Sequence, residues 1–232
     1  MSAPFAHRRR PLTHKTITLA HGGGGSAMRD LIDDVFLSTF SGEGHGAPED
    51  QARFDLAALA AKGDRLAFTT DGFVVDPLFF PGGDIGTLAV CGTVNDLAVG
   101  GAEPVALSCA VIIEEGLEVE TLRRVAASMA RAAREAGVAI ATGDTKVVAR
   151  GACDKLFITT TGIGVVRTGL HVGIDQASPG DVVLVNGLLG DHGAAILNAR
   201  GDLALETQIE SDCAPLNGLI ADLIAAAPGI RM

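Results

Sequence analysis

Three aspartates stand where a folded chain could build a site for a divalent cation. Asp144 follows an apolar run and a glycine, Asp71 ends a second apolar run, and Asp96 lies at the edge of an apolar helical stripe. A buried strand that delivers an acid at its end is typical of the rim of an α/β site. Carboxylates suit Mg²⁺, which bridges phosphates and needs only a few protein oxygens. We therefore predict that these three aspartates meet around one metal ion.

A lysine accompanies one of these acids. Lys146 stands two residues after Asp144, so on an extended segment both side chains project to the same side. There the ammonium group could neutralise charge that develops on a transferred phosphoryl group. A solvated loop lysine is the alternative interpretation.

A run of glycines precedes a predicted helix near the start of the chain. Its residues are Gly22, Gly23, Gly24, Gly25 and Ser26. Apolar residues recur at helical spacing from Ala27 onward, and a glycine-rich turn that opens a helix points N–H groups and the helix dipole at an anion. The spacing also fits a variant of the dinucleotide fingerprint, although the polar segment 41–50 stands where its second strand should begin. A flexible hinge is the alternative.

Composition limits the class of protein and of partner. At 232 residues and 47% apolar content, the chain is long enough for one large domain or up to two ordinary ones. The net charge of -10 argues against a nucleic-acid polymer as partner, because such binders carry a basic face. A small anion such as a nucleotide needs only a local site. The sequence has no run of about 18 apolar residues, which argues against a membrane span.

The four cysteines are Cys91, Cys109, Cys153 and Cys213, and none is paired in a metal-type C-x-x-C motif. Three of the four sit in apolar contexts. We expect reduced, mostly buried thiols in a cytoplasmic protein.

Strands and helices alternate along most of the chain. Apolar runs predict strands over 16–20, 66–77, 104–113, 138–147 and 155–166. Hydrophobic periodicity predicts helices from Ala27, over 85–98 with Asp84 as the N-cap, and over 118–136 with Gly137 as the terminator. This alternation predicts an α/β fold of the mixed or α+β kind, with a mixed sheet packed against helices.

Loops and composition predict the domain boundaries. Residues 1–15 are basic and are predicted to form a disordered tail, and 16–170 to form the first domain. A polar turn at 175–180 marks a boundary. Beyond it we expect a strand over 181–187, a helix over 190–200 and a last helix capped by Ser211 or Asp212. One strand and two helices cannot easily bury a hydrophobic core of their own. We therefore predict that 181–232 is the incomplete start of a second domain.

Motifs of several common enzyme classes are absent. The sequence contains no G-x-x-x-x-G-K-[ST] string, which argues against a P-loop mechanism. It contains neither G-x-S-x-G nor H-E-x-x-H, which removes the common hydrolases and zinc proteases. His21 and His192 adjoin glycines, and we expect both to be hydrogen-bonded structural residues. The interpretation that remains is a site in which carboxylates bind Mg²⁺ and phosphate.

Several strings together carry a resemblance to a known family. They are His21-Gly22 with the glycine run, DPLFFPGG at 76–83, CGTVND at 91–96, TGDTKV at 142–147 and GDHG at 190–193. From about Thr16 to Met232 the chain closely resembles the HypE family of hydrogenase maturation proteins. That family belongs with aminoimidazole ribonucleotide synthetase, selenophosphate synthetase and thiamine-monophosphate kinase. The Asn-Asp and Gly-Asp-Thr elements are shared across the group, whereas DPLFFPGG and GDTKV look specific to HypE.

The resemblance implies a fold, a reaction and partners. It implies an aminoimidazole ribonucleotide synthetase-like N-terminal domain that dimerises through its sheets and holds ATP and Mg²⁺ near that interface. The reaction is the ATP-dependent dehydration of a C-terminal cysteine S-carboxamide to a thiocyanate, which supplies the cyanide ligand of the [NiFe]-hydrogenase iron. ATP would phosphorylate the amide oxygen, and loss of phosphate would give the nitrile. The partners implied are the carbamoyltransferase HypF and the HypC–HypD complex, in the cytoplasm.

The same resemblance assigns roles to particular residues. It implies that the glycine run forms a flap over the phosphates and that Lys146 faces the carbamoyl group or the γ-phosphate. The shared elements add Asn95 and Thr145 to the nucleotide-binding residues. The metal ligands that it implies are Asp71, Asp96 and Asp144.

One departure from the family pattern keeps other functions open. Family members continue past this point and end in a Pro-Arg-Ile-Cys-like tail, whereas this sequence stops at Ile230-Arg231-Met232, so we expect it to be inactive alone as a dehydratase. One alternative is an ATP-dependent small-molecule kinase or synthetase of the same group. The other is a non-catalytic dimerisation module.

Overall fold

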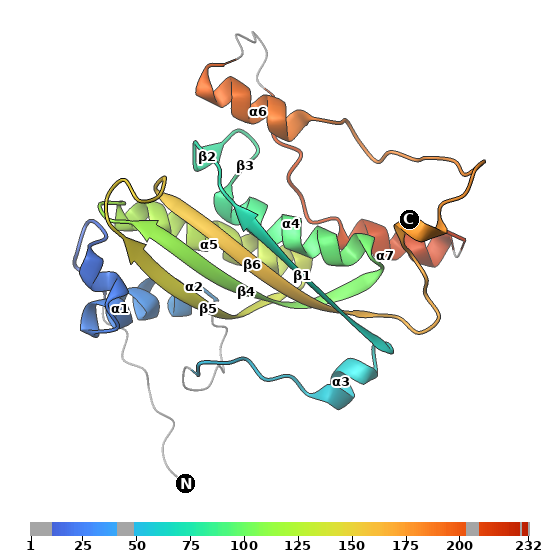
Figure 1. Cartoon of the computed structure of the whole chain (residues 1–232), viewed down its shortest axis with the longest axis horizontal. Helices are drawn as coiled ribbons and strands as arrows, with labels where there is room; N and C mark the ends of the chain where they lie inside the picture. The colour runs from blue at the N-terminus through green and yellow to red at the C-terminus, as the bar shows by residue number, and fades with distance from the viewer. Residues whose placement is uncertain (1–10, 41–48, 203–208, 228, 232) are drawn as a thin grey trace.

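The protein is built on one mixed four-stranded sheet (Figure 1), as a computed structural model describes it for residues 11–40, 49–202, 209–227 and 229–231. The strand order is β1-β6-β4-β5, with β1 antiparallel to β6, β6 antiparallel to β4, and β4 parallel to β5. The bounds of these strands are β1 Arg65–Phe73, β4 Ala102–Glu114, β5 Ala139–Val148 and β6 Leu156–Val166. The prediction of a mixed sheet packed with helices is confirmed.

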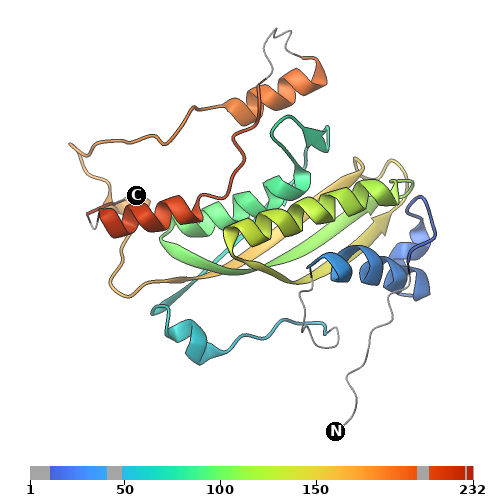
Figure 2. The same ribbon diagram turned by 180° about the vertical axis from the view of Figure 1, so that it is seen from behind.

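Two long helices cover one face of this sheet (Figure 2). Helix α4 (Ile85–Val99) begins at Asp84, whose side chain accepts the N–H groups of Gly86 and Thr87, as predicted. Helix α5 (Val119–Ala136) ends at Gly137, whose left-handed conformation (φ 72°) forms the expected C-terminal cap. Helix α5 also makes the crossover connection that the parallel pair β4–β5 requires.

The core lies between these helices and the sheet. Its largest fully buried side chains include Ile85, Leu107, Leu122, Met129 and Ile158. They recur at helical spacing on the helices and on alternate positions of the strands, so each element turns one apolar side inward. The core is mostly aliphatic, as the absence of Trp and Tyr predicts, and it includes Phe73 and Phe80.

The other face of the sheet is the face turned to the viewer in Figure 1 and is rich in exposed apolar side chains. Leu66 and Phe68 of β1 are 65% and 74% exposed, and Ile112 of β4 is 40% exposed. Each points away from the helices, because the neighbouring positions along its strand point toward them. We call this surface the open face.

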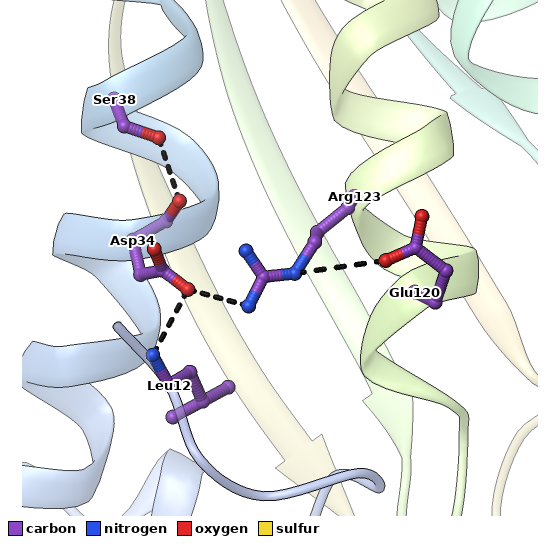
Figure 3. Close-up of polar contacts among 5 residues, drawn as sticks. All are labelled: Leu12, Asp34, Ser38, Glu120 and Arg123. Carbon is purple, nitrogen blue, oxygen red and sulfur yellow. Dashed lines mark hydrogen bonds and ion pairs between the residues drawn. The ribbon is translucent and has the colours of Figure 1, made fainter.

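A buried ion pair attaches the N-terminal helical segment to α5 (Figure 3). This segment consists of α1 (Ser26–Leu31), η2 (Ile32–Leu37) and α2 (Ser38–Phe40). Within it the side chain of Asp34 is 2% exposed and lies 2.6 Å from the Arg123 guanidinium. Asp34 also accepts the N–H of Leu12, and the Val119 N–H donates to the Lys15 carbonyl. Two residues of the predicted tail are thus hydrogen-bonded to the domain, while residues 1–10 lie outside the described part.

A small hairpin precedes α4. Its strands are β2 (Phe79–Phe80) and β3 (Gly83–Asp84), and the peptide bond between Asp76 and Pro77 is cis. The prediction that the preceding strand extends to Pro77 is wrong: β1 ends at Phe73, close to where its neighbour β6 begins. The chain leaves the sheet there and places Val75 in the core.

The segments after the sheet carry little core of their own. Helix α6 (Asp191–Arg200) agrees with the prediction, but no strand forms over 181–187. Val182, Val183 and Leu184 are more than 80% exposed, because no strand within the described ranges lies beside them to pair their backbone groups. Helix α7 (Asn217–Ala226) begins later than predicted, since residues 211–216 run extended over α4. The other short elements are η1 (Leu19–Gly22), α3 (Leu56–Ala60) and η3 (Ile174–Gln176).

The strand predicted over 16–20 is also replaced. Thr16 forms a single bridge to Glu118, and η1 follows. The Thr18 N–H donates to the ring Nδ1 of His21 at 2.9 Å, which favours a turn over an extended strand. Within the described ranges, no helix has both the length and the apolar character that crossing a membrane requires.

Replacing Arg123 with alanine should destabilise the protein by about 2 kcal/mol, because it removes the cation that lies against the buried Asp34 carboxylate. Chemical denaturation would measure this loss. Arg131→Ala is the matched control, since Arg131 lies at an exposed position of the same helix. Equal stability of the two variants would show that the ion pair does not attach the N-terminal segment.

Candidate functional site

Asp71 of β1 and Asp96 of α4 lie on the side of the sheet that the helices cover. The Thr69 hydroxyl donates to the Asp96 carboxylate at 3.3 Å. A Cβ placed on Gly92 would lie 3.8 Å from Asp71 Oδ2, so the Asp71 carboxylate faces α4 at the turn before Asp96. Both aspartates are exposed to solvent. We call Thr69, Asp71 and Asp96 the β1 group.

Asp144 does not join them within one chain, so the predicted meeting of three acids on one rim is wrong for the monomer. Asp71, Thr160, Cys109 and Gly143 lie in one row across the sheet. Thr160 is fully buried against α4, so this row faces the helices, and the next residue, Asp144, points to the open face. In addition, β1 and β5 are the two outer strands, about 14 Å apart at three interstrand spacings.

The acid is also not at the end of its strand, because β5 continues through it to Val148. Gly143 is required where it stands: a Cβ there would lie 2.2 Å from the carbonyl oxygen of Cys109 on β4. The glycine of the Gly-Asp-Thr element therefore serves the close approach of β4 and β5.

Asp144 and Lys146 form an exposed ion pair on the open face, as the two-residue spacing predicts. Their charged groups are 3.0 Å apart. The hydrogen bond from Lys146 holds the pKa of the Asp144 carboxyl below its usual range, and the Thr145 N–H adds to this effect. Thr145 itself is 4% exposed and turns to the helix side, where its side chain is not accessible to a ligand on the open face.

The glycine run lies against the same outer strand. Gly22 contacts Val147 so closely that a Cβ would approach its backbone nitrogen to 2.8 Å, and Gly24 has a positive φ of 76°. Gly25 is the N-cap of α1 and meets no atom of the described residues within 4 Å of an added Cβ. A hollow of about 420 Å³ lies beside it, lined by Met28 and Arg29 among others. We call the run Gly22–Ser26, Asp144 and Lys146 the β5 group.

Asn95 holds the segment that leads to α7, a contact that was not predicted. Its side-chain amide donates to the carbonyl of Ala214 at 3.0 Å and accepts the N–H of Leu216 at 2.7 Å. Both ends of the amide are thus used to hold the extended segment that precedes α7. Sequence alone offers no sign of this contact, because 119 residues separate Asn95 from Ala214.

The donor atoms of the β1 group suit a magnesium ion. Two carboxylates and a hydroxyl are hard oxygen ligands, and the remaining positions around Mg²⁺ are usually filled by water and phosphate. Across the described ranges, no three Asp, Glu, His or Cys side chains gather into a complete protein cage. Thr69 was not predicted, although its two-residue spacing from Asp71 places both on one face.

The two histidines have structural contacts. His21 is fully buried with its Nδ1 against Thr18, and burial lowers its pKa. His192 Nδ1 lies 3.0 Å from the Ser211 hydroxyl, and its ring packs edge-on against Phe80 of the hairpin. These contacts match the structural interpretation of both residues.

Comparison with known proteins identifies the domain. The family described as AIR synthase related protein, N-terminal domain, matches residues 49–166. Carbamoyl dehydratase HypE of Rhodobacter capsulatus is 64% identical over 220 residues, which cover 95% of this chain and 64% of that protein. Carbamoyl dehydratase HypE of Escherichia coli (strain K12) is 57% identical over 215 residues, which cover 93% of this chain and 64% of that protein. The chain thus spans less than two thirds of the length of these relatives.

Solved structures agree with this result. A crystal structure of the hydrogenase maturation protein HypE in complex with ATP superposes with a TM-score of 0.83 at 52% identity, covering 90% of this chain and 61% of that one. A chain of a HypE–HypF complex superposes with a TM-score of 0.71 at 48% identity, covering 90% of this chain and 64% of that one. The resemblance to HypE that the sequence strings predict is confirmed by these names. Because the family match begins before β1, ends with β6 and takes in half of the residues, the chain belongs to the AIR synthase related family.

Proposed function

We propose that this chain is the ATP-binding and dimerisation part of a carbamoyl dehydratase that acts in [NiFe]-hydrogenase maturation in the cytoplasm. The observation that carries the proposal is the 64% identity to a protein of that name along nearly the whole chain. The whole protein would dehydrate a C-terminal cysteine S-carboxamide to a thiocyanate at the expense of ATP. A solved relative has ATP bound, which supports ATP as the nucleotide.

The β1 group is the proposed metal site. Asp71 and Asp96 would hold the Mg²⁺ of the nucleotide, with Thr69 orienting Asp96 through its hydroxyl. Bound Mg²⁺ would neutralise negative charge on the phosphates. In the β5 group, the run Gly22–Ser26 would cover the phosphates and Lys146 would face the γ-phosphate or the carbamoyl group. The exposed backbone around Gly25, where the described residues leave space, supports this role for the run.

The two groups can serve one site if two chains associate. Within one chain Asp144 and Lys146 lie on the face opposite to Asp71, across the width of the sheet. A homodimer formed through the open faces would cover the exposed apolar side chains there and carry the β5 group of each chain to its partner. We propose that each nucleotide site combines the β1 group of one chain with the β5 group of the other.

The proposed protein partners come from the relatives. A structure of HypE in complex with HypF supports HypF as a partner of the longer protein. The HypC–HypD complex is proposed as a further partner on the resemblance alone.

Asp96→Ala should weaken MgATP binding to the 232-residue protein roughly tenfold or more, which corresponds to about 1.4 kcal/mol. The reason is the loss of one of two carboxylate ligands. Calorimetric titration would measure the affinity, with Asp222→Ala as the matched control on an exposed position of α7. If Asp96→Ala binds MgATP as tightly as the unchanged protein, the β1 group is not the metal site and a non-catalytic dimerisation module is favoured.

Mixing two inactive variants tests the shared site. Asp96→Ala and Lys146→Ala should each bind MgATP poorly, but dimers that contain one of each keep one intact site. After random exchange of subunits, about a quarter of the sites should bind normally. The measurement is nucleotide binding by the mixture against the mean of the separate variants. Binding no higher than that mean argues that both groups belong to the same chain's site.

Phe68→Lys should shift the protein toward the monomer, weakening association roughly tenfold or more, because it places a charge in the apolar part of the open face. Phe68 is 74% exposed, so the fold itself should be unaffected. Sedimentation at several concentrations would report the change. Leu219→Lys, at a half-exposed apolar position of α7, is the control. An unchanged sedimentation profile for Phe68→Lys would place the dimer contact elsewhere.

A further inference from the structure

The extended segment before α7 is held at three points, one on the turn of the β2–β3 hairpin and two on α4. The Ser211 N–H donates to the Pro81 carbonyl at 2.9 Å. Further along, Asn95 holds both Ala214 and Leu216 through its side-chain amide. Cys213 lies between these anchors, and its own N–H donates to the Ser211 hydroxyl at 3.2 Å. Its position over the helix is therefore set on both sides.

This arrangement brings two cysteines together. Cys91 stands one helical turn before Asn95 and is 2% exposed in the core. Cys213 is half-buried and packs against the same core cluster. Cys213 precedes Ala214, which Asn95 holds, and Cys91 lies one turn before Asn95, so the two thiols are neighbours although 122 residues separate them along the chain.

The two thiols differ in how readily they react. The neighbouring Cys91 thiol lowers the pKa of Cys213, whereas the Cys213 thiol and burial raise the pKa of Cys91. Cys213 is also the more exposed of the two. A thiolate is the form that attacks a disulfide, so Cys213 would react first and Cys91 would follow from within the core.

We propose that Cys91 and Cys213 are a redox pair that closes to a reversible disulfide and locks the segment 211–216 onto α4. The oxidant is a low-molecular-weight disulfide such as oxidised glutathione. The Cys213 thiolate attacks one sulfur and releases one thiol, leaving a mixed disulfide. The Cys91 sulfur then attacks Cys213, its proton leaves to the second departing thiolate, and both electrons of the oxidation end on the two released thiols.

The disulfide would act beside the proposed metal site. It would hold Asn95 in its contact with the segment, and the residue after Asn95 is Asp96 of the β1 group. In the reduced state only hydrogen bonds and packing hold the segment, so it can separate from α4 by local opening. Oxidation would remove that freedom, and a reducing thiol would restore it.

Oxidised glutathione added to the folded 232-residue protein tests this pair. We expect the number of free thiols, titrated after denaturation, to fall from four to two. Proteolysis without reduction and mass spectrometry should then give one cross-linked peptide that contains Cys91 and Cys213 and disappears with dithiothreitol. Hydrogen exchange of the Leu216 amide should slow about tenfold or more in the oxidised protein.

Two variants separate the pair from other thiol chemistry. Cys213→Ser should abolish the cross-link and leave Cys91 reduced, and Cys153→Ser should leave the cross-link intact. Thermal unfolding would verify that both variants fold. Recovery of Cys91 and Cys213 as alkylated thiols from the unchanged protein, or glutathione retained on Cys213 while Cys91 stays free, would overturn the proposal.

Discussion

The close packing of α4 on strand β6 is the constraint on which the rest of the structure depends. Gly162 leaves no room for a Cβ, which would lie 2.9 Å from Leu97 and Thr93, and the buried Thr160 hydroxyl donates to the Ala89 carbonyl. Held this tightly, α4 presents different residues on its two flanks. Asp96 faces β1, whereas Cys91 and Asn95 face the segment that leads to α7. The proposed metal site and the attachment of the C-terminal segment therefore depend on the same helix.

Strand alternation divides the family's site residues into two groups. A change of one position along β5 moves a side chain from the helix side to the open face, so Gly143 and Thr145 serve packing while Asp144 and Lys146 meet solvent. A sheet covered on one side only must find a second cover for its apolar side chains. The proposed homodimer would supply this cover. It would also complete the polar site, so dimer formation and nucleotide binding would depend on each other.

Local patterns predicted much of the fold. Asp84 and Gly137 mark the ends of α4 and α5 because capping depends on a few neighbouring residues. The three aspartates do not meet within one chain, because the face on which a strand residue lies is set by pairing with distant strands. The strand over 181–187 failed for a related reason, since backbone pairing needs a neighbour that the described chain does not supply. Asn95 shows the same limit for side-chain contacts.

The exposed run Val182–Val185 has a practical consequence for work with this protein. Its four consecutive β-branched or aliphatic residues have no strand partner within the described ranges, so they are a template on which another copy can add a strand. Such growth is open-ended, unlike a closed pair of sheets, so it leads to aggregates as concentration rises. Solubility during storage and crystallisation would then be governed by this short run, and a charged residue introduced there would extend the usable concentration range.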